Sequence, residues 1–184
     1  MTGDVAGKPL IVVMGVCGCG KSTVGELMAH ELGVPFLDGD SLHPAENVAK
    51  MAAGTPLTDK DRWPWLATAG TRLRDAGEGG LVLACSALRR SYRDAIRAQA
   101  PDTLFLHLHG SRKVLEQRLA ARSGHFMPAA LLDSQLTTLE PLEADELGLV
   151  IDIARPLQQV LAGAINSLTG GVGVTETSAY THRR

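Results

Sequence analysis

The sequence predicts an α/β fold built on a mostly parallel sheet. Short apolar runs typical of buried strands alternate with helix-like apolar stripes, which is the order in which parallel sheets are connected. The first run, Leu10–Met14, is bounded by Pro and Gly and is typical of a strand buried on both faces. With 184 residues, 45% of them apolar and 21% charged, the chain suits one globular domain.

The remaining elements follow in order along the chain. Further strands are expected at 34–38, 81–85, 103–109 and 147–153. Helices are expected after the first strand, around 24–32, and then at 44–53, 64–76, 88–96, 114–119 and 157–168. Gly54 is suited to end the second helix, and Pro64 to occupy the first turn of the third.

The segment Gly15–Ser22, between the first strand and the first helix, matches the phosphate-binding loop signature G-x-x-x-x-G-K-[ST]. Its glycines allow backbone N–H groups to approach phosphate oxygens, and the following helix points its N-terminal N–H groups at the same anion. Lys21 supplies positive charge for the β and γ phosphates, and the Ser22 hydroxyl is suited to ligate Mg²⁺. The loop therefore predicts binding of a nucleoside triphosphate.

Two carboxylates, Asp38 and Asp40, follow the second predicted strand, at the edge where open α/β sheets bind ligands. One can hold Mg²⁺ and the other can accept a proton from a substrate hydroxyl. The alternative is a turn that caps a helix. Because the third strand ends in Cys85-Ser86 without an acid, Asp38 is favoured as the metal-side carboxylate.

Arginines gather after the second and third strands and suit a small anionic substrate, because guanidinium binds carboxylate in a bidentate manner. They are Arg62, Arg89, Arg90 and Arg93. The alternative for each is a solvated helix face. Arg118 and Arg122 are spaced to share one helix face, from which they can neutralise a phosphoryl group or stack on adenine.

The segment 123–142 interrupts the strand–helix alternation. We expect it to form a lid over the phosphates, with a plain helical hairpin as the alternative. Residues 1–8 are expected to form a short tail before the domain at 9–168, and residues 169–184 lack periodicity and are expected to be disordered.

Composition limits the partners. The net charge is −2 and no basic block is present, so nucleic acid is not expected as a partner. No apolar run approaches the roughly 18 residues of a membrane span, and the N-terminus has no signal-peptide core. Three cysteines do not make a disulfide framework. We expect a cytoplasmic protein.

The Asp-Gly-Asp turn belongs to a longer pattern that resembles the gluconokinases of the phosphate-loop (P-loop) type. The resemblance runs from about Leu10 to Leu168 and rests on Asp38–Pro44, Pro64–Leu66, Cys85–Leu88, Tyr92–Asp94 and Gly124–Met127. It implies a three-layer P-loop NTPase fold, with a five-stranded parallel sheet, helices on both faces and a lid insertion. It also implies Mg²⁺, ATP as phosphoryl donor, the 6-hydroxyl of D-gluconate as acceptor, and a homodimer.

The resemblance implies site residues as well. ATP would be bound by the loop, the helix start, two arginines and the turn after the last strand: Gly15, Val16, Cys17, Gly18, Cys19, Gly20, Lys21, Ser22, Thr23, Arg118, Arg122 and Pro156. Gluconate would be bound by Asp40, His43, Arg62, Ser86, Arg90 and His125. Lys21, Asp40 and Arg122 would be catalytic, and Ser22 and Asp38 would hold the metal.

Two alternatives to a gluconate kinase remain open at this point. One is a kinase of another small acid such as shikimate, against which the His43-Pro44 and Trp63-Pro64-Trp65 contexts argue. The other is a non-catalytic nucleotide switch, which needs no acceptor site. Cys17 and Cys19 stand where the family usually has Ser, and they are either small packing residues or thiols activated by Lys21 and the helix N-terminus.

Overall fold

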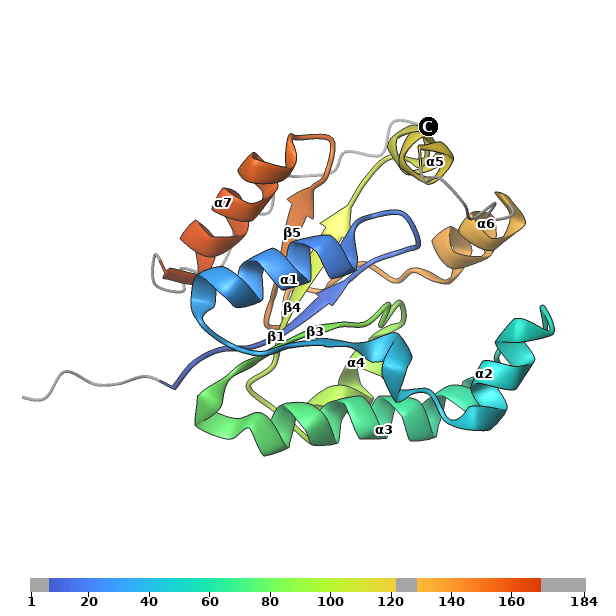
Figure 1. The fold of residues 1–184 in the computed structure, drawn as a ribbon, viewed down its shortest axis with the longest axis horizontal. Helices are drawn as coiled ribbons and strands as arrows, with labels where there is room; N and C mark the ends of the chain where they lie inside the picture. Colours follow the sequence, from blue (N-terminus) through green and yellow to red (C-terminus); the bar gives the residue numbers. More distant parts are fainter. Residues whose placement is uncertain (1–6, 122–128, 170–184) are drawn as a thin grey trace, which may run out of the picture.

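A five-stranded parallel sheet forms the centre of the molecule, with strand order β2-β3-β1-β4-β5 (Figure 1). The structure is a computed structural model and describes residues 7–121 and 129–169. The strands are β1 (Leu10–Met14), β2 (Phe36–Asp38), β3 (Leu81–Ala84), β4 (Leu104–His109) and β5 (Gly148–Asp152). The α/β fold class and the five strands are thus confirmed.

Seven α-helices lie within the described residues. They are α1 (Lys21–Leu32), α2 (Ala45–Ala52), α3 (Asp59–Ala76), α4 (Arg90–Arg97), α5 (Arg112–Ala120), α6 (Ala129–Thr138) and α7 (Leu157–Thr169). Two short 3₁₀ helices, η1 (Gly39–Leu42) and η2 (Gly77–Gly79), follow β2 and α3. None of the described helices combines the length and the apolar character that crossing a membrane requires.

Helices cover both faces of the sheet, α1 and α7 on one side and α3 and α4 on the other (Figure 1). The strands are apolar on both faces, so two cores form. On β1, Ile11 and Val13 join the core under α1 and α7, whereas Val12 and Met14 join the core over α3 and α4. Both cores end at the carboxyl edge of the strands, where the functional side chains gather.

Helix α3 begins five residues before the position at which the sequence pattern placed Pro64 in a first turn. Thr58 accepts a hydrogen bond from the Asp61 backbone N–H, and the Asp61 side chain accepts from the Thr58 backbone N–H. This capping box starts the helix at Asp59. Pro64 therefore lies inside the helix, so the prediction of its first-turn position is wrong.

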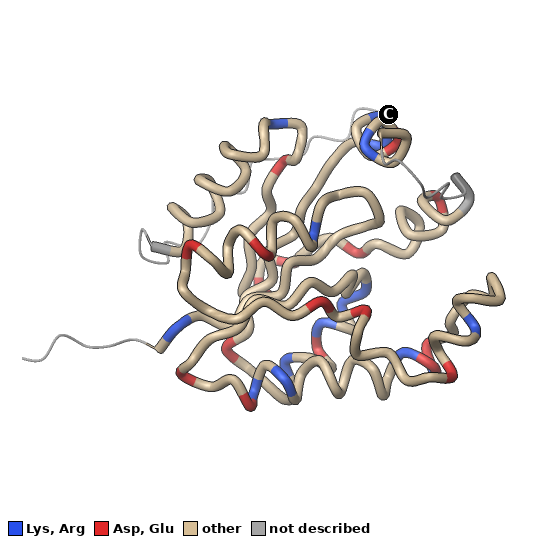
Figure 2. The backbone as a smooth tube through the Cα atoms, in the orientation of Figure 1, with Lys and Arg blue, Asp and Glu red and all other residues tan. Residues whose placement is uncertain are grey.

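The segment 123–142 contains helix α6, and residues 122–128 lie outside the described residues. The expected tail at 169–184 lies beyond the described chain from residue 170, and the expected tail at 1–8 lies outside it up to residue 6. Positions with acidic and basic side chains are mixed along α2 and α3 rather than separated by sign (Figure 2).

Candidate active site

The phosphate-binding loop, Gly15–Ser22, joins β1 to α1. Gly15, Gly18 and Gly20 have φ angles of 143°, 80° and 96°, a region that favours glycine. A Cβ on Gly15 would lie 2.9 Å from the Leu108 carbonyl oxygen. Gly20 is the N-cap of α1 and provides no side-chain cap, so the first turn of the helix faces an anion site with its backbone N–H groups.

Lys21 and a glutamine from α6 hold opposite sides of one loop peptide. Lys21 Nζ donates to the Val16 carbonyl at 3.2 Å, and the Cys17 N–H donates to Gln135 Oε1 at 2.6 Å. The two contacts tie the start of the loop to its lysine and to a helix more than a hundred residues later in the chain.

Asp38 ends β2 and lies against the start of α1. Ser22 Oγ donates to Asp38 Oδ2 at 3.1 Å, and the Asp40 N–H donates to Asp38 Oδ1 at 3.0 Å. A hydroxyl and a carboxylate are hard oxygen donors of the kind that Mg²⁺ prefers. The described residues contain no cluster of three or more Asp, Glu, His or Cys that could hold a metal ion. The pair therefore fits an ion that also takes phosphate and water oxygens.

Asp40 is exposed in η1 and faces a histidine that packs on an indole ring. His43 stacks on Trp65 with ring centroids 4.2 Å apart, and Trp65 Nε1 donates to the Gly39 carbonyl at 2.7 Å. Burial lowers the pKa of His43, and the Asp40 charge opposes this shift. A Cβ on Gly39 would lie 2.5 Å from the Ala84 carbonyl oxygen, so only glycine permits this turn beside β3.

Arg62 and Arg89 meet at a shared acid. Arg89 Nη1 lies 2.8 Å from Asp59 Oδ2, and Arg62 Nη1 lies 3.5 Å from Asp59 Oδ1. Both guanidinium groups also lie about the Tyr92 ring, at 5.8 Å and 5.7 Å from its centroid. The Tyr92 hydroxyl donates to Asp59 at 2.5 Å, and this bond contributes most to lowering the pKa of Asp59.

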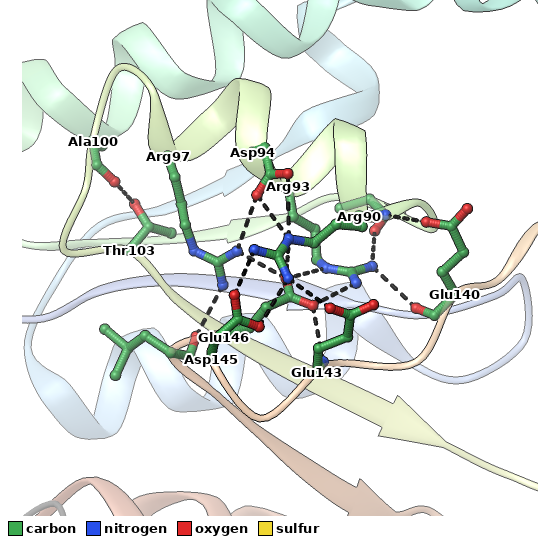
Figure 3. Close-up of polar contacts among 12 residues, drawn as sticks. Arg90, Arg93, Asp94, Arg97, Ala100, Thr103, Glu140, Glu143, Asp145 and Glu146 are labelled. Carbon is green, nitrogen blue, oxygen red and sulfur yellow. Dashed lines mark hydrogen bonds and ion pairs between the residues drawn. The ribbon is translucent and has the colours of Figure 1, made fainter.

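Arg90, which the resemblance assigns to gluconate, lies in a different set of contacts. Its guanidinium donates to Asp94 at 3.0 Å, to Glu143 at 3.0 Å and to both oxygens of Asp145 at 2.9 Å (Figure 3). The adjacent Arg89 takes the position beside Arg62. Sequence reasoning named Arg89 in the cationic group but did not select it for the site, and it gave no site role to Asp59 or Tyr92.

Arg93 is fully buried and joins the loop after β3 to the segment before β5 (Figure 3). It donates to both carboxylate oxygens of Glu146 at 2.7 Å and to the carbonyls of Ala87, Leu88, Glu140 and Pro141. Ala87 has a φ of 41°, which is strained for a residue with a Cβ. Arg93 thus holds the turn that follows Ser86, while the Ser86 carbonyl accepts from the Gly15 N–H at 3.3 Å.

Arg118 lies between the loop and the turn after β5. It donates to the Cys19 carbonyl at 3.3 Å and to the Ile153 carbonyl at 2.7 Å. Pro156 immediately precedes α7 in the same turn region. Arg122 and His125 lie outside the described residues, so their assigned roles stay predictions.

The loop cysteines are buried. Cys19 is fully buried, and this burial raises the pKa of its thiol despite the nearby Lys21 and Arg118. Burial also raises the pKa of Cys85 to about 12. This favours packing over thiolate reactivity for Cys19.

The sequence of this chain is similar to those of known small-molecule kinases. A protein-family model described as Shikimate kinase matches residues 17–146. The gluconokinase of Gluconobacter oxydans is 52% identical over 76% of this chain and 80% of the relative. The thermoresistant gluconokinase of Escherichia coli is 44% identical over 88% of this chain and 94% of the relative. The chain belongs to the gluconokinase family.

A solved structure supports the same family. A gluconokinase from Sinorhizobium meliloti is 49% identical, covers 89% of this chain and 93% of its own, and has a TM-score of 0.82. The chain is thus a nucleotide-binding kinase, and the P-loop fold that the resemblance implies is confirmed.

Proposed function

We propose that this chain transfers the γ-phosphoryl group of ATP to the 6-hydroxyl of D-gluconate and gives 6-phosphogluconate. The observation that carries the proposal is the Asp-Gly-Asp turn after β2. The Ser22 hydroxyl donates to Asp38 at 3.1 Å, and Asp40, two residues further, lies close enough to His43 for its charge to oppose the lowering of the His43 pKa. Gluconokinase relatives at 44–52% identity over most of the chain support the substrate.

The donor side of the site binds the triphosphate. Loop N–H groups and Lys21 would hold the β and γ phosphates, and Arg118 would contact the nucleotide from the turn after β5. Ser22 and Asp38 would hold Mg²⁺, which neutralises charge on the phosphates when bound. Donors and cations that the fold holds in place in this way stabilise the charge that develops on the transferring phosphoryl group.

The acceptor side binds the sugar acid. Among the described residues, Arg62 and Arg89 form ion pairs with Asp59 alone, so two cations face one anion and one positive charge is left to attract a carboxylate. A neutral His43 and the Ser86 hydroxyl are suited to bind sugar hydroxyls. Asp40 would accept the proton of the reacting hydroxyl.

The test is ATP consumption measured with gluconate, with shikimate and with no acid, with the product located by phosphorus NMR. We expect consumption that requires gluconate and a phosphate on its 6-oxygen. The assay includes shikimate because the matching family model is described as Shikimate kinase. ATP consumption with shikimate and not with gluconate would support a shikimate kinase instead. Consumption that ignores both acids would overturn the proposal.

We further propose that the protein is a cytoplasmic homodimer, on the basis of the family resemblance. Sedimentation equilibrium at micromolar concentration would give twice the monomer mass of 19.5 kDa. A single species at the monomer mass contradicts the dimer.

A further inference from the structure

Two side chains form hydrogen bonds with the peptide between Val16 and Cys17, one with its carbonyl and one with its N–H. Its carbonyl accepts from Lys21 Nζ at 3.2 Å, and its N–H donates to Gln135 Oε1 at 2.6 Å. Gln135 lies on α6 and is half-buried. The proposed reaction uses Lys21 directly but assigns no task to Gln135.

The geometry of a peptide links these two contacts. A peptide group is planar and its C=O and N–H point in opposite directions, so a hold on the N–H also orients the carbonyl. Gly15 and Gly18 flank this peptide at φ angles that only glycine adopts easily, and the loop holds the Val16 carbonyl with one bond of its own, from the Cys19 N–H at 3.3 Å. Gln135 adds a second and shorter hydrogen bond, to the N–H on the other side of the peptide, which keeps the carbonyl directed at Lys21.

The orientation of this peptide also determines where the ammonium group of Lys21 lies. Its nitrogen has three donors, and the bond to Val16 uses one of them, which leaves two for phosphate oxygens. Loss of the carbonyl would free a long, flexible side chain at the point where charge develops on the transferring phosphoryl group.

We propose that Gln135 is a positioning residue for phosphoryl transfer. It fixes the Val16–Cys17 peptide and, through the carbonyl of that peptide, the Lys21 ammonium group. The inference rests on the proposed function for its kinetic test, and on the loop geometry alone for its structural test. The competing view is that Gln135 Oε1 only fills a phosphate-oxygen position on the Cys17 N–H until the nucleotide displaces it.

The experiment compares Gln135→Met, Gln135→Glu and a control, Thr137→Ala. Met has similar length without a strong acceptor, and Glu keeps an acceptor at the same reach. Thr137 lies on the same helix, and among the described residues its hydroxyl bonds within α6, to the Asp133 carbonyl at 2.9 Å. For Gln135→Met we expect kcat to fall about tenfold, the loss of one hydrogen bond, with KM for gluconate unchanged.

For Gln135→Glu we expect kcat within about threefold of wild type, because the acceptor is retained, and a raised KM for ATP from its added negative charge. Thr137→Ala should match wild type. If Gln135→Met keeps its kcat, or binds ATP more tightly by calorimetry than wild type, Gln135 competes with nucleotide and the proposal is overturned. Should the Met variant not fold, Gln135→Asn, shorter by one methylene, replaces it with the same expectation.

A second readout does not depend on gluconate turnover. The Cys17 amide resonance in a nitrogen-15 spectrum should shift strongly in Gln135→Met and stay in place in Thr137→Ala, because only the first loses its acceptor. If the Cys17 amide resonance does not move in Gln135→Met, Gln135 does not bind this peptide and the proposal is overturned. The spectra of the two variants could show the expected pattern while the wild-type enzyme shows no gluconate-dependent ATP use. In that case the proposed function fails and the contact between Gln135 and the Cys17 N–H stands.

Discussion

The Asp38 carboxylate accepts two hydrogen bonds at the phosphate end of the site, and its neighbour Asp40 is exposed. Asp38 accepts from Ser22 Oγ and from the Asp40 N–H, whereas Asp40 faces His43. These different surroundings support the proposal that Asp38 holds the metal and Asp40 accepts the proton of the gluconate hydroxyl. We expect Asp40→Asn to lower kcat by about 10²–10⁴ with a small change in ATP affinity. Steady-state kinetics with each substrate varied measures this.

Asp38→Asn should instead raise the Mg²⁺ concentration needed for half-maximal activity, because the amide is a weaker ligand than a carboxylate. A magnesium titration of the two variants separates the roles. If Asp40→Asn is the variant that needs more Mg²⁺, the roles of the two acids are exchanged.

Lys21 is expected to be essential to the chemistry and dispensable for folding, since its side chain is half-buried and its one described hydrogen bond is to Val16. Lys21→Ala should reduce kcat by at least about 10²–10³, because it removes a positive charge that stabilises the transition state. The urea midpoint should stay near that of wild type. A folded variant that retains most of its kcat contradicts the assignment.

The adjacent arginines give a matched comparison. Arg62→Ala and Arg89→Ala should each raise KM for gluconate about tenfold or more, with little change for ATP, because each removes a charge-assisted contact worth about 1.5–3 kcal/mol. Arg90→Ala serves as the control, since its guanidinium is held by Asp94, Glu143 and Asp145. A gluconate KM that rises only in Arg90→Ala would return the substrate contact to that residue.

Sequence reasoning located the loop, Asp38 and the cationic group because these follow from local signatures at strand ends. It selected Arg90 over Arg89 through the resemblance, whereas the structure places Arg89 beside Arg62. Neighbouring residues at the start of a helix point in different directions, and the choice depends on Asp59 and on the acids at 143–145, which only the tertiary fold brings near. Tyr92 supported the resemblance but was given no role in the site, although its hydroxyl reaches Asp59.

At the scale of elements, the strands were predicted within two residues of their observed ends because buried parallel strands are continuous apolar runs. The start of α3 was missed although Thr58 and Asp61 carry a capping box in the sequence, because Pro64 was given more weight as a start signal. The joining of α4 to the segment before β5 was not predicted, since ion pairs across about 50 positions leave no periodic signal.

This joining depends on a fully buried ion pair between Arg93 and Glu146 (Figure 3). Glu146→Ala leaves the Arg93 charge buried without its partner and should lower the free energy of unfolding by about 3–5 kcal/mol. Urea unfolding at neutral pH measures it. The control is Asp75→Ala, whose exposed pair with Arg74 should contribute less than about 1 kcal/mol. Equal losses in the two variants would mean that the network does not hold α4 to this segment.

For the whole molecule, the site draws its parts from both layers. The loop and α1 belong to the layer that also contains α7, while Arg62 on α3 and the Arg89 next to α4 belong to the other (Figure 1). The sheet between them must stay intact for donor and acceptor sides to face each other. Global stability therefore limits activity, and its pH dependence can be predicted from buried titratable groups in the sheet and the site.

His107 lies in β4 and is almost fully buried, and burial lowers its pKa to about 4, with further lowering by the charges of His109 and Arg93. The unfolded chain takes up this proton near pH 6.5 and the folded chain does not, so stability is full above pH 6.5 and falls as the pH drops toward 4. His43, with its pKa also lowered by burial, adds to the same fall.

The pH window between 6.5 and 4.5 isolates these histidines. Burial tends to raise the pKa of Glu146, but hydrogen bonds from Arg93 and Arg97 outweigh it and lower the pKa to about 2, so the Glu146 contribution is lost only below about pH 4.5. Urea unfolding at several pH values should show a free energy that falls with a slope of up to about 1.4 kcal/mol per pH unit for each histidine. His107→Gln should reduce this slope, whatever it does to stability at pH 7.5. The slope that remains should be the contribution of His43. If the slopes of wild type and variant coincide, His107 is protonated in the folded protein and its burial does not control acid stability.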